Sequence, residues 1–201
     1  RITEINYNPP GGSVHEFIEL QNVGSAPLDL SGDYFDEGIT FTFSAGSSLA
    51  AGARLILANN TDTNSFASRY PGVPVAGYFS GTLANSGERL TLRSAAGHIL
   101  LTLDYRDSGG WPTAADGAGA TLEVVSPSGD PDDAANWVAS SQAGGTPGIA
   151  PTPAAPSAIR LSEIMAENLG AVNNSGTFPD WIELQNTSGA PVNIAGWSVS
   201  N

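Results

Sequence analysis

EFIELQNVGSAPLDLSG, residues 16–32, returns later in the chain as DWIELQNTSGAPVNIAG, residues 180–196, at a constant offset. The segment before each copy also recurs, as Ile2-Thr3-Glu4-Ile5 and as Leu161-Ser162-Glu163-Ile164. Self-similarity at a fixed period indicates an array of structural units. We therefore predict one unit that begins near residue 1 and another that begins near residue 159.

The composition excludes several classes of protein. The 201 residues carry a formal net charge of −13, and their seven basic residues are all arginines. Nucleic acid is excluded as an expected partner, because a phosphate-binding surface needs clustered Lys and Arg. There is no cysteine, so neither a disulfide framework nor a thiolate metal site can form. No apolar stretch is long enough to predict a membrane span.

Alternating apolar and polar residues predict short strands over 39–43, 90–93 and 99–105. Gly-containing turn signals lie between these segments, which is typical of strands joined by tight turns. One short helix is expected from Ser65 to about Tyr70, where Pro71-Gly72 ends it. Many short strands with regular turns favour an all-β sandwich.

The same patterns divide the chain into three parts. Residues 1–148 are enough for one complete domain with its own core. Residues 149–158, IAPTPAAPSA, contain three prolines and predict an extended linker. Residues 159–201 match only the opening third of the first unit, and a piece of that size cannot close a sandwich core. We expect it to be ordered by borrowing surface from the first domain, from another chain or from the rest of a domain.

The order of these segments resembles the lamin tail domain, the immunoglobulin-like module of nuclear lamins that also occurs in large secreted bacterial proteins. The resemblance extends over residues 1–148, and residues 159–201 resemble a truncated second copy. The segments that carry it, besides the repeated stretch, are SGTLANSGERLTLR (80–93), Asp104-Tyr105, GGWPTAADGAGATLEVV (109–125) and SGDPDDAANW (128–137). The resemblance implies an immunoglobulin-like β-sandwich and an accessory repeat in a secreted or cell-surface multidomain bacterial protein.

Glu4 and Glu19 are the candidate acidic pair, because both recur, as Glu163 and Glu183. Two carboxylates on neighbouring strands can act as acid and base or can hold a cation. Glu19, however, alternates with Ile18 and Leu20, so it is expected on the opposite, outer face of its sheet. There it would pair with an arginine or a backbone donor. Repetition in both units favours this structural role over catalysis.

The densest acidic cluster suggests a calcium site. Its metal ligands would be Asp130, Asp132 and Asp133, since Ca²⁺ prefers carboxylate and carbonyl oxygens. Asn136, Asp107 and Asp116 are further candidates. The alternative is a capped turn in which Asp130 or Asp132 accepts backbone amides ahead of a short helical turn. We favour the capped turn, and calcium is the only cofactor that this sequence suggests.

Trp111 lies in a Gly-rich loop and is the candidate ligand or partner contact. An exposed indole there would stack on a sugar or on a partner protein. The alternative, which the resemblance favours, is a side chain that closes one end of the sandwich. Neither His15 nor His98 has a neighbour that suggests a metal pair or a triad, and no nucleophile elbow or phosphate-binding loop is present. We predict no enzymatic activity.

The function expected is a non-catalytic structural or interaction module of a larger secreted or cell-surface protein. Its partners would be other protein domains or chains, including a second copy of itself through the incomplete repeat. One alternative is an adhesion module that binds calcium or glycans through 130–133 and Trp111. Another is an accessory domain of an extracellular hydrolase whose catalytic part lies outside this chain.

Overall fold

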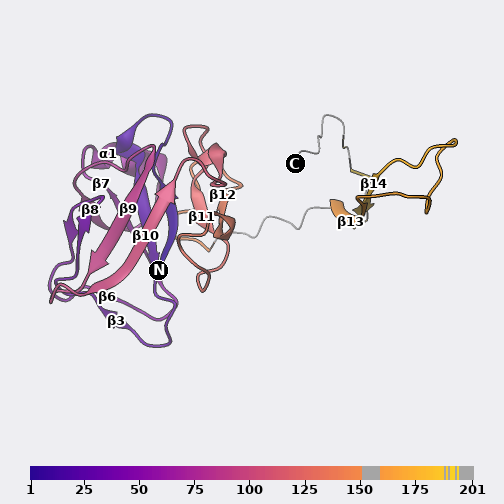
Figure 1. Cartoon of the computed structure of the whole chain (residues 1–201). Coiled ribbons are helices and arrows are strands. Elements are labelled where there is room, and N and C mark those ends of the chain that lie inside the picture. Colours follow the sequence, from indigo (N-terminus) through magenta and orange to yellow (C-terminus); the bar gives the residue numbers. More distant parts are fainter. Residues whose placement is uncertain (151–158, 188, 190, 193, 195–201) are drawn as a thin grey trace. The chain divides into compact units, whose positions relative to one another are not determined.

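The computed structural model describes residues 1–150, 159–187, 189, 191, 192 and 194. The chain forms two compact units, Arg1–Thr152 and Pro153–Asn201 (Figure 1). Strands predominate in both units, and in the described residues only one α-helix forms. Among these residues, no helix has the length and apolar character needed to cross a bilayer.

Two sheets build the first unit as an immunoglobulin-like sandwich. The larger sheet has the order β12 (Trp137–Ala139), β11 (Leu122–Val124), β1 (Ile2–Asn6), β2 (Phe17–Gln21), β7 (Arg54–Asn59) and β8 (Val75–Phe79). The smaller has the order β10 (Ile99–Arg106), β9 (Gly87–Arg93), β4 (Tyr34–Glu37) and β5 (Phe41–Thr42). A separate pair joins β3 (Leu28–Asp29) to β6 (Ser48–Leu49). Three 3-10 turns, η1 (Ser13–His15), η2 (Thr113–Ala115) and η3 (Ala134–Asn136), lie in the loops. The predicted all-β sandwich is confirmed.

The core lies between the two sheets, because each strand turns alternate side chains inward. Ile5 and Ile18 from the larger sheet meet Phe35 and Leu90 from the smaller one, and all four are buried. Tyr105 of β10 reaches the ring of Tyr7, with ring centroids 5.1 Å apart. These contacts join segments that are distant in sequence, so the sandwich holds its loops in fixed positions.

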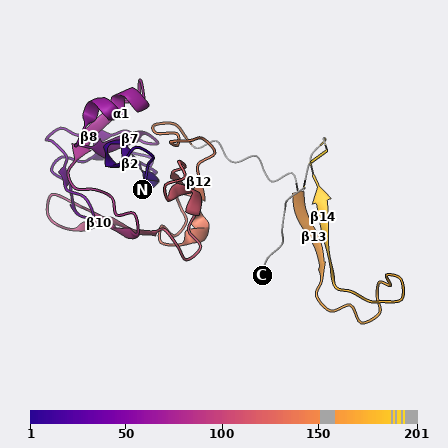
Figure 2. The same cartoon turned by 90° about the horizontal axis from the view of Figure 1, so that it is seen from above.

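The one α-helix, α1 (Thr63–Arg69), connects the parallel strands β7 and β8. It begins two residues before the predicted start, because the side chain of Asp62 accepts hydrogen bonds from the amides of Asn64 and Ser65. Phe66 packs edge-on against Phe17 of β2. The helix therefore covers the outer face of the larger sheet, on the side away from β10 (Figure 2).

The described part of the second unit is a hairpin of β13 (Ile159–Met165) and β14 (Trp181–Asn186). Glu163 lies opposite Glu183, and an irregularity follows Leu161. The pairing of β1 with β2 has the same form, with Glu4 opposite Glu19 and an irregularity after Ile2. The repeated sequence thus folds with a repeated register.

The two hairpins differ in what covers them. The four apolar side chains that are at most 6 % exposed in the first unit have counterparts that are 42–60 % exposed in the second. The buried set is Ile2, Ile5, Ile18 and Leu20, and the exposed set is Leu161, Ile164, Ile182 and Leu184. That the second hairpin borrows surface to cover this face stays a prediction, and so do the domain boundaries at 148 and 158.

Candidate functional site

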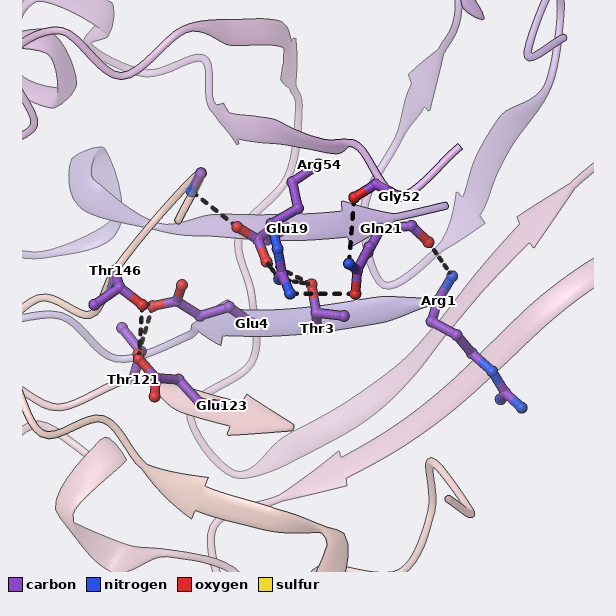
Figure 3. A network of polar contacts seen from close by, with 11 residues as sticks. Arg1, Thr3, Glu4, Glu19, Gln21, Gly52, Arg54, Thr121, Glu123 and Thr146 are labelled. Carbon is purple, nitrogen blue, oxygen red and sulfur yellow. Dashed lines mark hydrogen bonds and ion pairs between the residues drawn. The ribbon is translucent and has the colours of Figure 1, made fainter. Parts of the chain in front are cut away.

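A bulge in β1 brings Glu4 beside Glu19. In the pairing with β2, Ile2 lies opposite Leu20 and Glu4 opposite Glu19, so Thr3 is an extra residue. Strict alternation would place Glu4 on the same face as Ile2, in the core. The bulge instead lets Thr3 and Glu4 share the outer face of the larger sheet, where both join one polar network (Figure 3).

Glu19 is bound from three sides. Its Oε1 forms an ion pair with the guanidinium of Arg54 and accepts a 2.5 Å hydrogen bond from the hydroxyl of Thr3. Its Oε2 accepts the amide of Gly148 at 2.8 Å. The predicted pairing with an arginine or a backbone donor is therefore confirmed. This part of the outer face is covered, because the side chain of Glu19 is 0 % exposed.

Glu4 is a buried acid held by neutral donors. Its Oε1 accepts from the hydroxyl of Thr121 at 2.7 Å and from the amide of Thr146 at 3.0 Å. Its Oε2 is buried and has no hydrogen-bond partner. Burial, with smaller contributions from Glu19 and Glu123, raises the pKa of Glu4 to about 8 against the opposing effect of the two donors. Glu4 is consequently a neutral carboxylic acid at pH 7.

Glu123 of β11 is a third acid on this face, and sequence reasoning missed it. It pairs with Glu4 across the sheet, and its Oε1 accepts from the hydroxyl of Thr146 at 3.0 Å. Burial raises its pKa. The local sequence could have indicated it, because Glu123 lies between the apolar residues Leu122 and Val124 just as Glu19 lies between its own apolar neighbours.

These acids fasten the segment 145–148 to the sheet. Glu4, Glu19 and Glu123 each accept at least one hydrogen bond from it. Two carboxylates that perform acid–base chemistry must reach a substrate. The three glutamates are at most 4 % exposed, and the segment 145–148 lies over them. The geometry gives them a structural role, and it places the end of the first unit against its own first strand.

At Gly145 the segment 145–148 lies too close to Glu4 and Thr121 to leave room for a side chain, and this supports a first prediction. Its φ of +79° is a conformation that other residues rarely adopt, and a Cβ there would overlap Glu4 Oε1 and the side chain of Thr121. We expect Gly145→Ala to lower the free energy of unfolding by about 2–4 kcal/mol, from backbone strain and displacement of the segment together.

Gly148 is the matched control, because it has a similar φ of +83° and no atom lies within 4 Å of the position that a Cβ would take. Gly148→Ala should cost only the strain of its backbone, about 1 kcal/mol. Urea unfolding of both variants measures the difference. Equal losses would show that the contact over Glu4 contributes nothing.

Glu16 is a fourth buried acid that the sequence did not reveal as a site. Its Oε2 accepts from the amide of Leu83 at 3.0 Å and from the side chain of Asn59 at 3.1 Å. Burial raises the pKa of Glu16 to about 7. The one indication of its role in the sequence is that an acid recurs at the same position of the second copy, Asp180. Asp180 accepts a hydrogen bond from the amide of Asn168 at 3.0 Å. In both units this acid ties a loop to its hairpin.

The three aspartates that are candidate calcium ligands each accept a backbone amide. Asp130 Oδ1 accepts from Asp132, Asp133 Oδ1 accepts from Ala135 at the start of η3, and Asp132 Oδ1 accepts from Asp104 on β10. In the described part of the chain, no group of three or more His, Cys, Asp or Glu side chains is placed to hold a metal ion. The geometry therefore matches a capped turn, but the residue that caps η3 is Asp133 and not Asp130 or Asp132.

The other candidates for that site have partners of their own or lie at other turns. Asp116 accepts the side-chain amide of Asn8 at 2.7 Å, and Asn136 binds the carbonyl oxygens of Ser126 and Asp130 as a donor. Asp107 is half-buried next to the end of β10. His15 is half-buried and His98 is exposed, each at its own turn.

Trp111 is buried, which corrects the expectation of an exposed binding platform. The side chain is 5 % exposed and stacks on Trp137, with ring centroids 5.7 Å apart. Trp137 is fixed in turn by a 2.8 Å hydrogen bond from its Nε1 to the carbonyl oxygen of Pro131. The pair fills the space beside β11 and β12, so Trp111 has no free ring face for a sugar or a partner.

Comparison with known protein families gives a match. A family model described as Lamin Tail Domain matches residues 1–107, more than half of the chain. This range contains β1 to β10, whereas β11 and β12 lie beyond it and still complete the larger sheet beside β1. No curated protein and no solved structure matches the chain.

Proposed function

Because the chain belongs to the lamin tail domain family, we propose that it is a non-catalytic interaction module of a larger secreted or cell-surface protein. Its partners are other protein domains or chains. The buried glutamates Glu4, Glu19 and Glu123 support the non-catalytic part of this proposal, because their carboxylates bind the module's own segment 145–148.

The observation that carries the proposal is the open edge at β10. This strand is the outermost of the smaller sheet, and its residues Ile99 and Leu100 are 59 % and 52 % exposed. At Asp104 the edge is closed, because that amide donates to Asp132 at 2.8 Å. Amides alternate in direction along a strand, so the amide of Thr102 also points outward. An extended partner segment can add to this edge through backbone hydrogen bonds, with Ile99 as an apolar contact.

A photo-crosslinking amino acid at Ile99 tests the proposal. Incubated with the secreted proteins of its source, the labelled chain should give a discrete crosslinked product. The same label at Ser86, which is exposed in a distant loop, should give none. Unlabelled protein should compete for the crosslink, whereas Ile99→Asp should compete at least tenfold more weakly, because a charge replaces the apolar contact. Equal crosslinking at both positions, or at neither, would contradict an interface at β10.

A further inference from the structure

Asp33 turns a carboxylate toward the interior of the sandwich. It precedes β4 and lies two residues before the buried Phe35, so the two side chains share the inward face. Its backbone is fixed by hydrogen bonds with Leu30 and Phe43. The side chain is enclosed, and Asp33 is only 7 % exposed. Its Oδ1 accepts the amide of Ala95 at 3.0 Å, while Oδ2 receives no hydrogen bond from the described residues.

Asp33 lines a pocket of about 670 Å³ at the end of the sandwich where β3 and β6 pair. Apolar residues predominate in its walls and include four buried leucines, Leu20, Leu30, Leu49 and Leu92, while Arg1 and Asp29 also line it. Leu28 and Leu100, both about half exposed, lie at its mouth and connect it to solvent. The volume and the mainly apolar lining are those of a site for a small organic molecule.

The sequence repeat shows which larger side chain the second copy carries at the position of Asp33. At the offset that aligns the two copies, Gly32-Asp33-Tyr34 corresponds to Gly196-Trp197-Ser198. Trp197 lies outside the described residues, so only its position in the sequence is used. Where the second copy carries an indole, the first carries a small acceptor. The exchange removes a large planar ring from an inward-facing position and adds an oxygen that accepts hydrogen bonds.

We propose that this pocket binds a flat aromatic ring bearing an N–H donor, a ligand of the indole class. The ring lies among the leucines in the place of the missing side chain, and its N–H donates to Asp33 Oδ2. Apolar walls supply affinity by burial. The Asp33 carboxylate supplies selectivity, because its unmet acceptor is costly in an apolar site, whereas Asp29, the other carboxylate of the pocket, already accepts hydrogen bonds from Ser31.

Indole itself is the probe, and naphthalene is the control of similar shape without a donor. Calorimetric titration of the full chain should show indole binding with a dissociation constant on the order of 0.1–1 mM. Naphthalene should bind at least tenfold more weakly, since it leaves the carboxylate without a partner. Equal affinity for the two molecules, or no binding of indole, would overturn the proposal.

Two substitutions separate filling of the pocket from recognition by the carboxylate. Asp33→Trp should abolish indole binding and raise Tm by about 2–6 °C, because it fills the cavity with the residue of the second copy. Asp33→Leu keeps the pocket apolar there and should remove the preference for indole over naphthalene. If Asp33→Leu retains that preference, the carboxylate is not the recognition group and the inference fails.

The pocket adjoins the proposed interface at β10, because Leu100 and Thr102 belong to both, but the two can be tested separately. Ile99 does not line it, so Ile99→Asp should leave the affinity for indole within a factor of two. Failure of the crosslinking experiment would therefore leave this inference standing. An Ile99→Asp variant that loses indole binding would contradict the placement of the ligand between the leucines.

Discussion

Glu19→Ala is expected to lower the free energy of unfolding of the first unit by about 3–5 kcal/mol, because it leaves a charged partner without its counterion in a buried site. The partner is Arg54, whose side chain is only 12 % exposed. The same substitution also removes the acceptors of Thr3 and of the Gly148 amide. Urea denaturation followed by the fluorescence of the stacked Trp111 and Trp137 reports this transition.

The chain contains its own control for this experiment. Glu183 stands in the same IELQN sequence, on a strand with the same register, but it is exposed and has no ion pair among the described residues. Glu183→Ala should change the unfolding of the first unit by less than about 0.5 kcal/mol. A loss below about 1 kcal/mol for Glu19→Ala would show that the ion pair is not an essential part of the fold.

A double substitution distinguishes the charge from the packing. Replacing Glu19 by Leu and Arg54 by Met removes both charges and keeps apolar volume at both positions. Proteins whose buried ion pairs are replaced in this way often recover their stability. The double variant should therefore be at least about 2 kcal/mol more stable than Glu19→Ala. If it is no more stable, the loss arises from the freed segment at Gly148 and not from the unpaired guanidinium.

The two hairpins could be predicted because their sequence pattern occurs twice in the chain. The offset between the copies placed Glu4 beside Glu19 and Glu163 beside Glu183, and the structure gives both pairs the same register. The outward direction of Glu19 followed from alternation, and the partner expected there was an arginine or a backbone donor; the structure shows both. Local pattern and repetition together therefore define the larger sheet near β1 and β2.

The cover over these acids was not predictable in the same way. The hydrogen bond from Thr146 to Glu4 joins residues 142 positions apart, and the one from Gly148 to Glu19 joins residues 129 apart. Nothing in the local pattern of 145–148 indicates that it lies on a sheet. The stacking of Trp111 could not be predicted for the same reason, because it depends on Trp137, which follows 26 residues later in β12.

The thermal stability of the first unit is expected to rise as the pH falls from 8 to 5, in contrast to the usual behaviour of carboxylates in ion pairs. The ordinary pKa of a glutamate is 4.5, and burial raises the pKa of Glu4 to about 8 and that of Glu16 to about 7. Burial also raises the pKa of Glu123. Between pH 4.5 and 8 the folded state therefore binds more protons than the unfolded state.

Linkage gives the sign of the effect. A state that binds an extra proton gains about 1.4 kcal/mol for each unit by which the pH falls. The stability that neutral Glu4 contributes is complete below pH 4.5 and is lost as the pH rises to 8. His15 opposes this trend, because burial lowers its pKa and so favours the unfolded state in acid. Asp62 and Asp29 also oppose it, but only near and below pH 3.8, because hydrogen bonds to serine lower their pKa values from that figure.

Glu4→Gln isolates the main contributor. The amide resembles the protonated acid in shape and charge, so the variant should match the wild type near pH 5 and be more stable than it near pH 8. Glu163→Gln, at the exposed counterpart, should leave the profile unchanged. Calorimetric scans of the first-unit transition at half-unit steps of pH provide the measurement. A Tm for the wild type that is constant or rising between pH 5 and 8 would contradict a neutral Glu4. If the slope persists in Glu4→Gln, the proton is held by Glu16 or Glu123, and the pH response originates away from the contact with Thr146.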